Sequence, residues 1–184
     1  MAHFLIGKFT AFYAEDLARA LEATGGGFQL YCEWSDYGTQ GGLLISPAMW
    51  REFAGPYLKR LVDLCHSAGV AYMLHSCGAV RELIPDFIRI GVDVLDPVQT
   101  MAAGMEPAAL KRDFGERIAF HGGLDTQSTL PFGGPEEVRA EVRQRTATLG
   151  RAGGYIIAPS HNIQPDTPVE NILAMYEPEL RAAR

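Results

Sequence analysis

Short apolar segments rich in β-forming residues alternate with helical segments along the chain, and this alternation is the strongest constraint on its fold. Strands that alternate with helices form a parallel sheet covered by helices. The chain is therefore predicted to be an α/β protein. Five segments are predicted to be strands: FQLYCEW from Phe28, AYMLH from Ala71, VDVLDP from Val92, RIAFHG from Arg117 and YIIAPS from Tyr155.

The helical segments carry recognisable start and stop signals. Ser46 followed by Pro47 predicts the start of a helix that ends at Gly69. Pro56 should kink or split this helix, because proline lacks the backbone N–H. Further helices are expected at 9–24, 135–149, after Gly78, after Met105 and from Pro168 onwards. The predicted order is one helix followed by five βα units.

Five units are too few to close a (β/α)8 TIM barrel, which takes eight units and about 250 residues. The 184 residues are therefore expected to form a single incomplete TIM-barrel domain over residues 1–184, without the N-terminal units of the barrel. In such a barrel the carboxyl ends of the strands face one side and form the active site. The polar residues at these ends are Glu33, Asp36, His75, Cys77, Asp96, Gln99, His121, Asp125, Gln127, His161, Asn162 and Gln164.

Two of these strand ends predict a metal site. His75 and Cys77 lie two residues apart where a strand becomes a loop, so both side chains point the same way while Ser76 points elsewhere. Imidazole and thiolate are good zinc ligands. His161, at the end of the last strand, offers a third nitrogen, and catalytic zinc sites use three protein ligands plus water or substrate.

Charge and composition exclude several classes of protein. The chain has 16 Lys and Arg against 22 Asp and Glu, a net charge of −6, and no basic run. Binding to nucleic acid or to an anionic membrane is therefore not expected. No apolar stretch reaches the roughly 18 to 20 residues of a membrane span, and the N-terminus lacks the charged region of a signal peptide. With three unpaired cysteines, the chain is expected to be cytoplasmic.

Four long segments carry a resemblance to a known family. They are GGLLISPAMWREFAGPYLKRLVDLCHSAG, LHSCGAVRELIPDFIRIGVDVLDPVQ, LKRDFGERIAFHGGLDTQSTLPFG and GGYIIAPSHNIQPDTPVENILAMY. Together they resemble the C-terminal part of the uroporphyrinogen decarboxylase superfamily, and its methyltransferase-like branch in particular. The resemblance implies a (β/α)8 barrel of roughly twice this length. In corrinoid-dependent methyltransferases of this superfamily, His-x-Cys after one strand and Cys after the last bind zinc; these positions correspond to His75, Cys77 and His161.

The last of these positions departs from the methyltransferase pattern. A histidine at His161 resembles the decarboxylases, which lack the His-x-Cys motif, so the chain combines one element from each branch. The mixed set remains chemically sound for zinc. The arginines and the aspartate with which decarboxylases hold the porphyrinogen carboxylates belong to the start of the barrel, which is absent from this sequence.

The zinc hypothesis allows two reactions. Zinc binds a substrate thiol and directs it at a methylcorrinoid, or it polarises a methylated small molecule so that a corrinoid takes the methyl group. No corrinoid-binding motif is present, so a partner corrinoid protein is expected to carry this cofactor. Asp36, Glu33 and Asp125 are candidates for proton transfer or for orienting His75, and His121 is a further catalytic candidate. The mouth would be formed by Gln99, Gln127 and Gln164.

Two other functions remain open at this point. The chain could be a metal-free decarboxylase of a tetrapyrrole, or a non-catalytic half of a split barrel. Five strands without closure leave two free edges and an uncovered inner face, with Leu30, Met73, Leu95, Phe120 and Ile157 as its predicted members. We therefore expect a homo-oligomer, or a complex with a separate chain that supplies the N-terminal half of the barrel.

Overall fold

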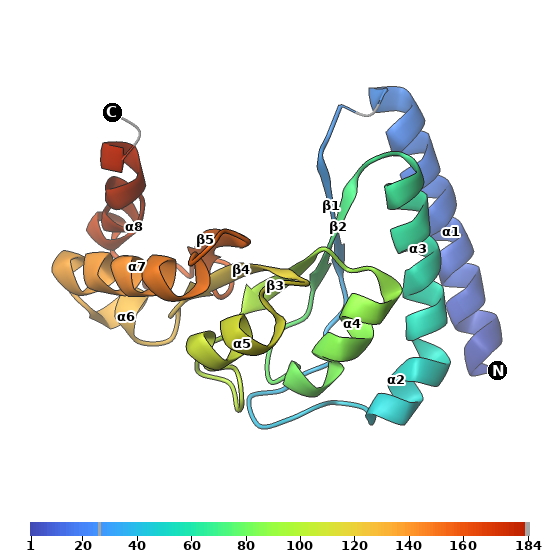
Figure 1. The fold of residues 1–184 in the computed structure, drawn as a ribbon, viewed down its shortest axis with the longest axis horizontal. Helices are drawn as coiled ribbons and strands as arrows, with labels where there is room; N and C mark the ends of the chain where they lie inside the picture. The colour runs from blue at the N-terminus through green and yellow to red at the C-terminus, as the bar shows by residue number, and fades with distance from the viewer. Residues whose placement is uncertain (26, 183–184) are drawn as a thin grey trace.

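The computed structural model describes residues 1–25 and 27–182, with side chains described as far as residue 177, and its central element is one parallel sheet (Figure 1). The strands follow one another in the order β1-β2-β3-β4-β5, and every neighbouring pair is parallel. Their bounds are β1 Leu30–Trp34, β2 Ala71–His75, β3 Val94–Val98, β4 Ala119–Leu124 and β5 Tyr155–Pro159. All five predicted strands are confirmed, and three of them start two residues later than predicted.

Helices separate the strands, as the sequence predicts. They are α1 Ala2–Thr24, α2 Pro47–Phe53, α3 Gly55–Ser67, the 3-10 helix η1 Arg81–Leu83, α4 Ile84–Ile90, α5 Pro107–Phe114, α6 Thr129–Phe132, α7 Pro135–Leu149 and α8 Val169–Ala182. The chain is thus a partial (β/α) barrel with five of the eight βα units.

The start and stop signals explain most helix boundaries. The Ser46 side chain accepts a hydrogen bond from the Met49 N–H at 3.2 Å and so caps α2. The predicted break near Pro56 is confirmed, because α2 ends at Phe53 and α3 starts at Gly55. Helix α1 starts at Ala2 rather than at Phe9, and nothing in the sequence between them interrupts a helix.

The helices cover one face of the sheet and leave the other open. Helix α3 packs on β2, α7 packs on β4 and β5, and α1 lies outside α3. The covered face carries the fully buried side chains of Tyr72, Leu74, Leu95 and Phe120. They form the main core together with apolar residues of the helices.

The prediction for the uncovered inner face was wrong for three of its five residues. Leu95 and Phe120 lie in the core beneath the helices, and Ile157 packs there against a second cluster between α6, α7 and α8. Met73 lines a cavity on the open face instead, and Leu30 shares that face because strand side chains alternate. A strand that is apolar on both faces does not reveal from its sequence which face is covered.

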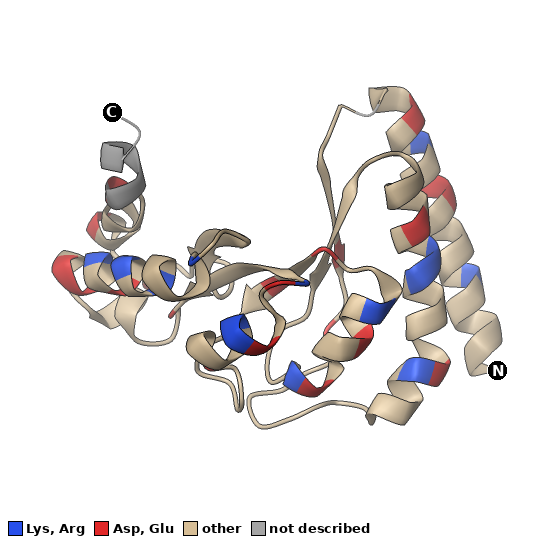
Figure 2. Cartoon of the chain, viewed as in Figure 1, with Lys and Arg blue, Asp and Glu red and all other residues tan. Residues whose placement is uncertain are grey.

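The molecule is an open arc with the two termini at opposite ends (Figure 1). Acidic and basic residues alternate along the helices on the outside of the arc (Figure 2). Among the described residues, no helix combines the length and the apolar character that crossing a membrane requires.

The edges of the sheet and the surface of α1 expose groups that usually lie in contacts. Among the residues that the structure describes, strands β1 and β5 each have one neighbour in the sheet, so their outer edges have no strand beside them. Helix α1 exposes a row of large apolar side chains, and Phe9 and Phe12 are 62% and 67% exposed. An exposed apolar surface of this kind is typical of a protein interface.

We predict that the chain associates through α1. At micromolar concentration, sedimentation should show a species larger than the monomer of about 20 kDa. Phe12→Glu should weaken this association, because it places a charge in the apolar row. Phe132→Glu is the matched control, because Phe132 is 78% exposed on α6 and far from α1 in the sequence. A cooperative monomer, or equal effects of both substitutions, would contradict the prediction.

Candidate functional site

Four side chains form a row across the open face, from the last residues of β1 and β2 to the middle of β3 and β4. Trp34 pairs in register with His75, and His75 pairs with Asp96. Leu95 pairs with Phe120, which places Asp96 beside His121 on the next step of the ladder. Because paired residues of parallel strands point to the same face, the register alone brings these four side chains together.

Asp96 joins the two imidazoles of this row. Its Oδ2 lies 2.6 Å from His75 Nδ1, and its Oδ1 lies 2.5 Å from His121 Nδ1. A carboxylate only accepts, so each imidazole donates from Nδ1 and presents Nε2 on its other side. Asp96 is 7% exposed. Its two hydrogen-bond partners satisfy both oxygens of a carboxylate that would otherwise be buried without compensation.

This arrangement shifts the pKa of both Asp96 and His75. Burial disfavours the charged carboxylate, but the hydrogen bonds from His121 and His75 outweigh it and lower the pKa of Asp96 to about 2. Burial also disfavours the imidazolium of His75, but hydrogen bonds to Asp96 and Cys77 raise the pKa of His75 to about 10. In the metal-free protein His75 is therefore charged at neutral pH.

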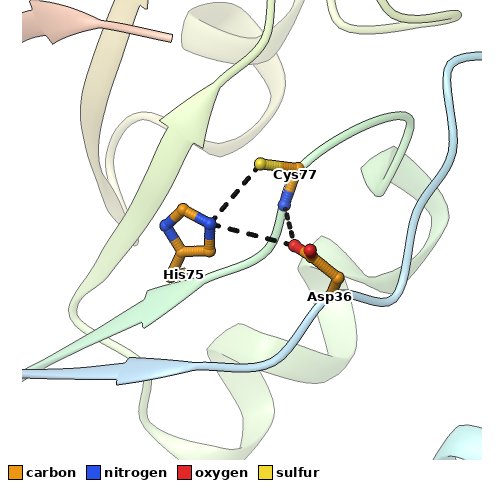
Figure 3. Close-up of side chains that lie close together, drawn as sticks. All are labelled: Asp36, His75 and Cys77. Carbon is orange, nitrogen blue, oxygen red and sulfur yellow. Dashed lines mark hydrogen bonds and ion pairs between the residues drawn. The ribbon is translucent and has the colours of Figure 1, made fainter. Parts of the chain in front are cut away.

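The other nitrogen of His75 belongs to a cluster of three metal-binding side chains. Figure 3 shows His75 at the end of β2, Cys77 on the following loop and Asp36 on the loop after β1. His75 Nε2 lies 3.4 Å from Cys77 Sγ and 3.8 Å from Asp36 Oδ1. One ligand atom from each residue lies within 4.8 Å of the other two. Carboxylate, imidazole and thiolate together suit zinc, and three ligands leave a position for substrate.

Two glycines allow the loops that carry Asp36 and Cys77 to pack closely. A Cβ at Gly38 would lie 2.6 Å from the carbonyl oxygen of Cys77, and a Cβ at Gly78 would lie 2.5 Å from that of Thr39. Gly78 also has a φ of +85°. The Asp36 carboxylate then accepts a hydrogen bond from the Cys77 N–H at 2.8 Å, so it fixes the position of its neighbour in the cluster.

A cavity of about 370 Å³ lies over the row of side chains, and His75, Asp96 and His121 contribute to its lining. The remaining walls are mainly apolar, with Trp34, Met73, Pro97, Ile163 and Tyr176 among them. The Trp34 indole stacks on the His75 ring with centroids 4.2 Å apart. The cavity is of the size that takes a small molecule.

His161 lies apart from the metal-binding cluster. It lines the same cavity, but its side chain is exposed and its Nδ1 lies 3.5 Å from the Asn162 carbonyl oxygen. The one cluster of potential ligands found among the described residues has Asp36 in the third position. Strands β3 and β4 separate β5 from β2 in the sheet.

The remaining predicted site residues occupy other surroundings. Glu33 points to the helix-covered side, where Ser35 donates to it at 2.6 Å and burial raises its pKa despite that hydrogen bond. Asp125 caps the turn after β4, accepting from the Gln127 N–H at 2.7 Å. Gln99 accepts from the Gly78 N–H at 2.9 Å and so supports the His-x-Cys loop. The side chains of Gln127 and Gln164 are exposed.

A model of the family described as "Uroporphyrinogen decarboxylase (URO-D)" matches residues 1–178. The chain belongs to the uroporphyrinogen decarboxylase family. It is similar to the uroporphyrinogen decarboxylase of Chlorobium limicola, with 24% identity over 96% of this chain and 48% of that protein. The uroporphyrinogen decarboxylase of Anaeromyxobacter sp. is 28% identical over 96% of this chain and 46% of its own length.

A solved structure shows the same fold. It is a methyltransferase from Methanosarcina mazei, with a TM-score of 0.65, 22% identity, and coverage of 85% of this chain and 43% of that one. The resemblance to the uroporphyrinogen decarboxylase superfamily that the sequence predicts is thereby confirmed. The chain spans about half the length of the curated relatives it matches.

We predict an unusual titration of His75 in this member of the uroporphyrinogen decarboxylase family. In the metal-free protein, NMR should show the His75 ring titrating at about pH 10. Because the pKa of His75 is raised in the folded state, its pair with Asp96 stabilises the protein fully below the ordinary imidazole pKa of about 6.5. This contribution disappears as the pH rises to about 10.

Asp96→Asn should return the titration of His75 towards about 6.5, because the neutral amide no longer favours the imidazolium. The His66 ring, whose Nε2 lies 2.7 Å from Asp93 at the opposite end of the sheet, should keep its spectrum in this variant because it does not contact Asp96. A His75 ring that titrates near about 6.5 in the unaltered chain would show that Asp96 does not hold it in the charged form.

Proposed function

We propose that this protein takes part in zinc-dependent methyl transfer between a small molecule and a corrinoid carried by a partner protein. The observation that supports this proposal most strongly is the cluster of Asp36, His75 and Cys77 at the carboxyl end of the sheet. In (β/α) barrels, this end carries the active site. The methyltransferase structure with the same fold is compatible with the proposal.

Zinc, when bound, would supply a Lewis acid that favours the thiolate form of a substrate or polarises a methylated donor. The chain's own residues would hold the ion and shape the cavity. The His75 ring is fixed by Asp96 on one side and by Trp34 against its face. Such support from behind orients a metal-binding imidazole and strengthens it as a ligand.

Asp36 has two proposed roles. Its carboxylate lies in the metal-binding cluster, and it is also 56% exposed at the side chain, as a group that exchanges protons with solvent would be. The remaining barrel units are proposed to close the arc and bring His161 towards the cluster as a further ligand. Those units would come from a partner chain or from a second copy of this one, in the cytoplasm.

Decarboxylation of a tetrapyrrole is the alternative function. The similarity to several uroporphyrinogen decarboxylases over nearly the whole chain supports it. A decarboxylase of this kind would need no zinc, so the metal distinguishes the two. The second alternative, a non-catalytic half of a split barrel, would leave the ligands without a bound ion.

We expect the purified chain to bind about one equivalent of zinc. Cys77→Ala should remove most of the metal, because thiolate is the strongest zinc ligand of the cluster. Cys32→Ala is the matched control: Cys32 lines the same cavity but lies outside the metal-binding cluster. Metal analysis after dialysis measures both. Equal amounts of zinc in the two variants would refute the site. The absence of zinc from both variants and from the unaltered chain would refute it as well.

Asp36→Asn separates the two roles of Asp36 when zinc affinity and methyl-transfer turnover are both measured. If Asp36 is a ligand, the substitution should lower zinc affinity by about 10-fold or more. If Asp36 is an acid or base, the variant should keep its zinc and lose about 100-fold in turnover.

A further inference from the structure

The His121 imidazole is held by a buried acid on one side and faces the cavity on the other. Its Nδ1 lies 2.5 Å from Asp96 Oδ1, and its side chain is 26% exposed. Within the part of the chain that the structure describes, no hydrogen bond or ion pair reaches its Nε2. This nitrogen is therefore available to a molecule in the 370 Å³ cavity.

The hydrogen bond to Asp96 determines what His121 can do chemically. Donation from Nδ1 fixes the tautomer in which Nε2 carries the lone pair, and a carboxylate behind the ring stabilises the imidazolium once a proton arrives. A base held by an orienting acid is the arrangement by which enzymes activate hydroxyl and thiol groups.

The same carboxylate also fixes the metal-binding cluster. Asp96 Oδ2 accepts from His75 while Oδ1 accepts from His121, so one rigid group sets the positions of both rings. His75 presents Nε2 to Asp36 and Cys77, and His121 approaches the cavity from β4, two strands away. Because His75 and His121 both line the cavity, a small molecule in it can contact the rings of both.

We propose that His121 is the proton acceptor for a thiol substrate bound in this cavity, with Asp96 as its positioning residue. The proposal rests on the proposed methyl transfer with a thiol as acceptor. The S–H bond breaks, its electron pair stays on sulfur, and the proton binds His121 Nε2. The imidazolium then pairs with the Asp96 carboxylate and keeps the proton while the thiolate stays bound. Once the thiolate has been methylated and has left, the ring releases the proton to water. No group is oxidised or reduced.

Counting protons tests this assignment without measuring turnover. The zinc-loaded chain is titrated with 2-mercaptoethanol as the probe thiol at about pH 8, where free imidazole is neutral and most thiol is protonated. Calorimetry in buffers of different ionisation enthalpy gives the number of protons released. We expect far less than one proton per thiol bound for the unaltered chain, and about one for His121→Asn, whose amide keeps the donor to Asp96 but accepts no proton.

His66→Asn is the control, because it removes the same side chain from a histidine–aspartate pair elsewhere and should leave proton release unchanged. His121→Gln repeats the comparison if the Asn variant does not fold. The ¹⁵N chemical shifts of the His121 ring in the unaltered chain report protonation of Nε2 on thiol binding without any substitution.

Zinc content is determined first, so that failure of the proposed function is recognised separately. If the unaltered chain binds zinc, three results would overturn the role of His121. The first is equal proton release by the unaltered chain and both His121 variants, and the second is no binding of the thiol. The third is loss of zinc from the His121 variants. An Nε2 that stays unprotonated when the thiol binds would overturn it as well.

Discussion

The carboxylate of Asp96 is the interaction on which the candidate site depends. It is buried in the middle of β3 and accepts hydrogen bonds from an imidazole on each neighbouring strand. Charge-assisted hydrogen bonds of this kind contribute about 1.5 to 3 kcal/mol each. They also determine which nitrogen of His75 faces the ligands and which nitrogen of His121 is left for the cavity.

The parallel register supplies the second constraint. Trp34, His75, Asp96 and His121 form a row because residues at equivalent heights of neighbouring parallel strands share a face. The two loops that add Asp36 and Cys77 approach each other only because Gly38 and Gly78 lack side chains. The site thus combines a sheet that positions one nitrogen with loops that bring the other two ligand atoms to it.

The strands, most helix starts and the His75 and Cys77 pair were predictable because each depends on local sequence. The importance of Asp96 was not predictable in this way, because it depends on which strands are neighbours. The available signal was an acid at the same strand height as two histidines. The face assigned to Leu95 was wrong because β3 is buried along its whole length, which removes the alternation that reveals a covered face. Glu33 directly precedes Trp34 in β1, so its side chain points to the opposite, helix-covered face.

X-ray absorption at the zinc edge of the loaded chain can show whether one zinc ion binds to Asp36, His75 and Cys77. The spectrum should contain one sulfur neighbour at about 2.3 Å and nitrogen or oxygen neighbours at about 2.0 to 2.2 Å. The sulfur neighbour should be missing from the spectrum of Cys77→Ala. A shell of nitrogen and oxygen alone in the unaltered chain would show that zinc binds elsewhere and would refute this site.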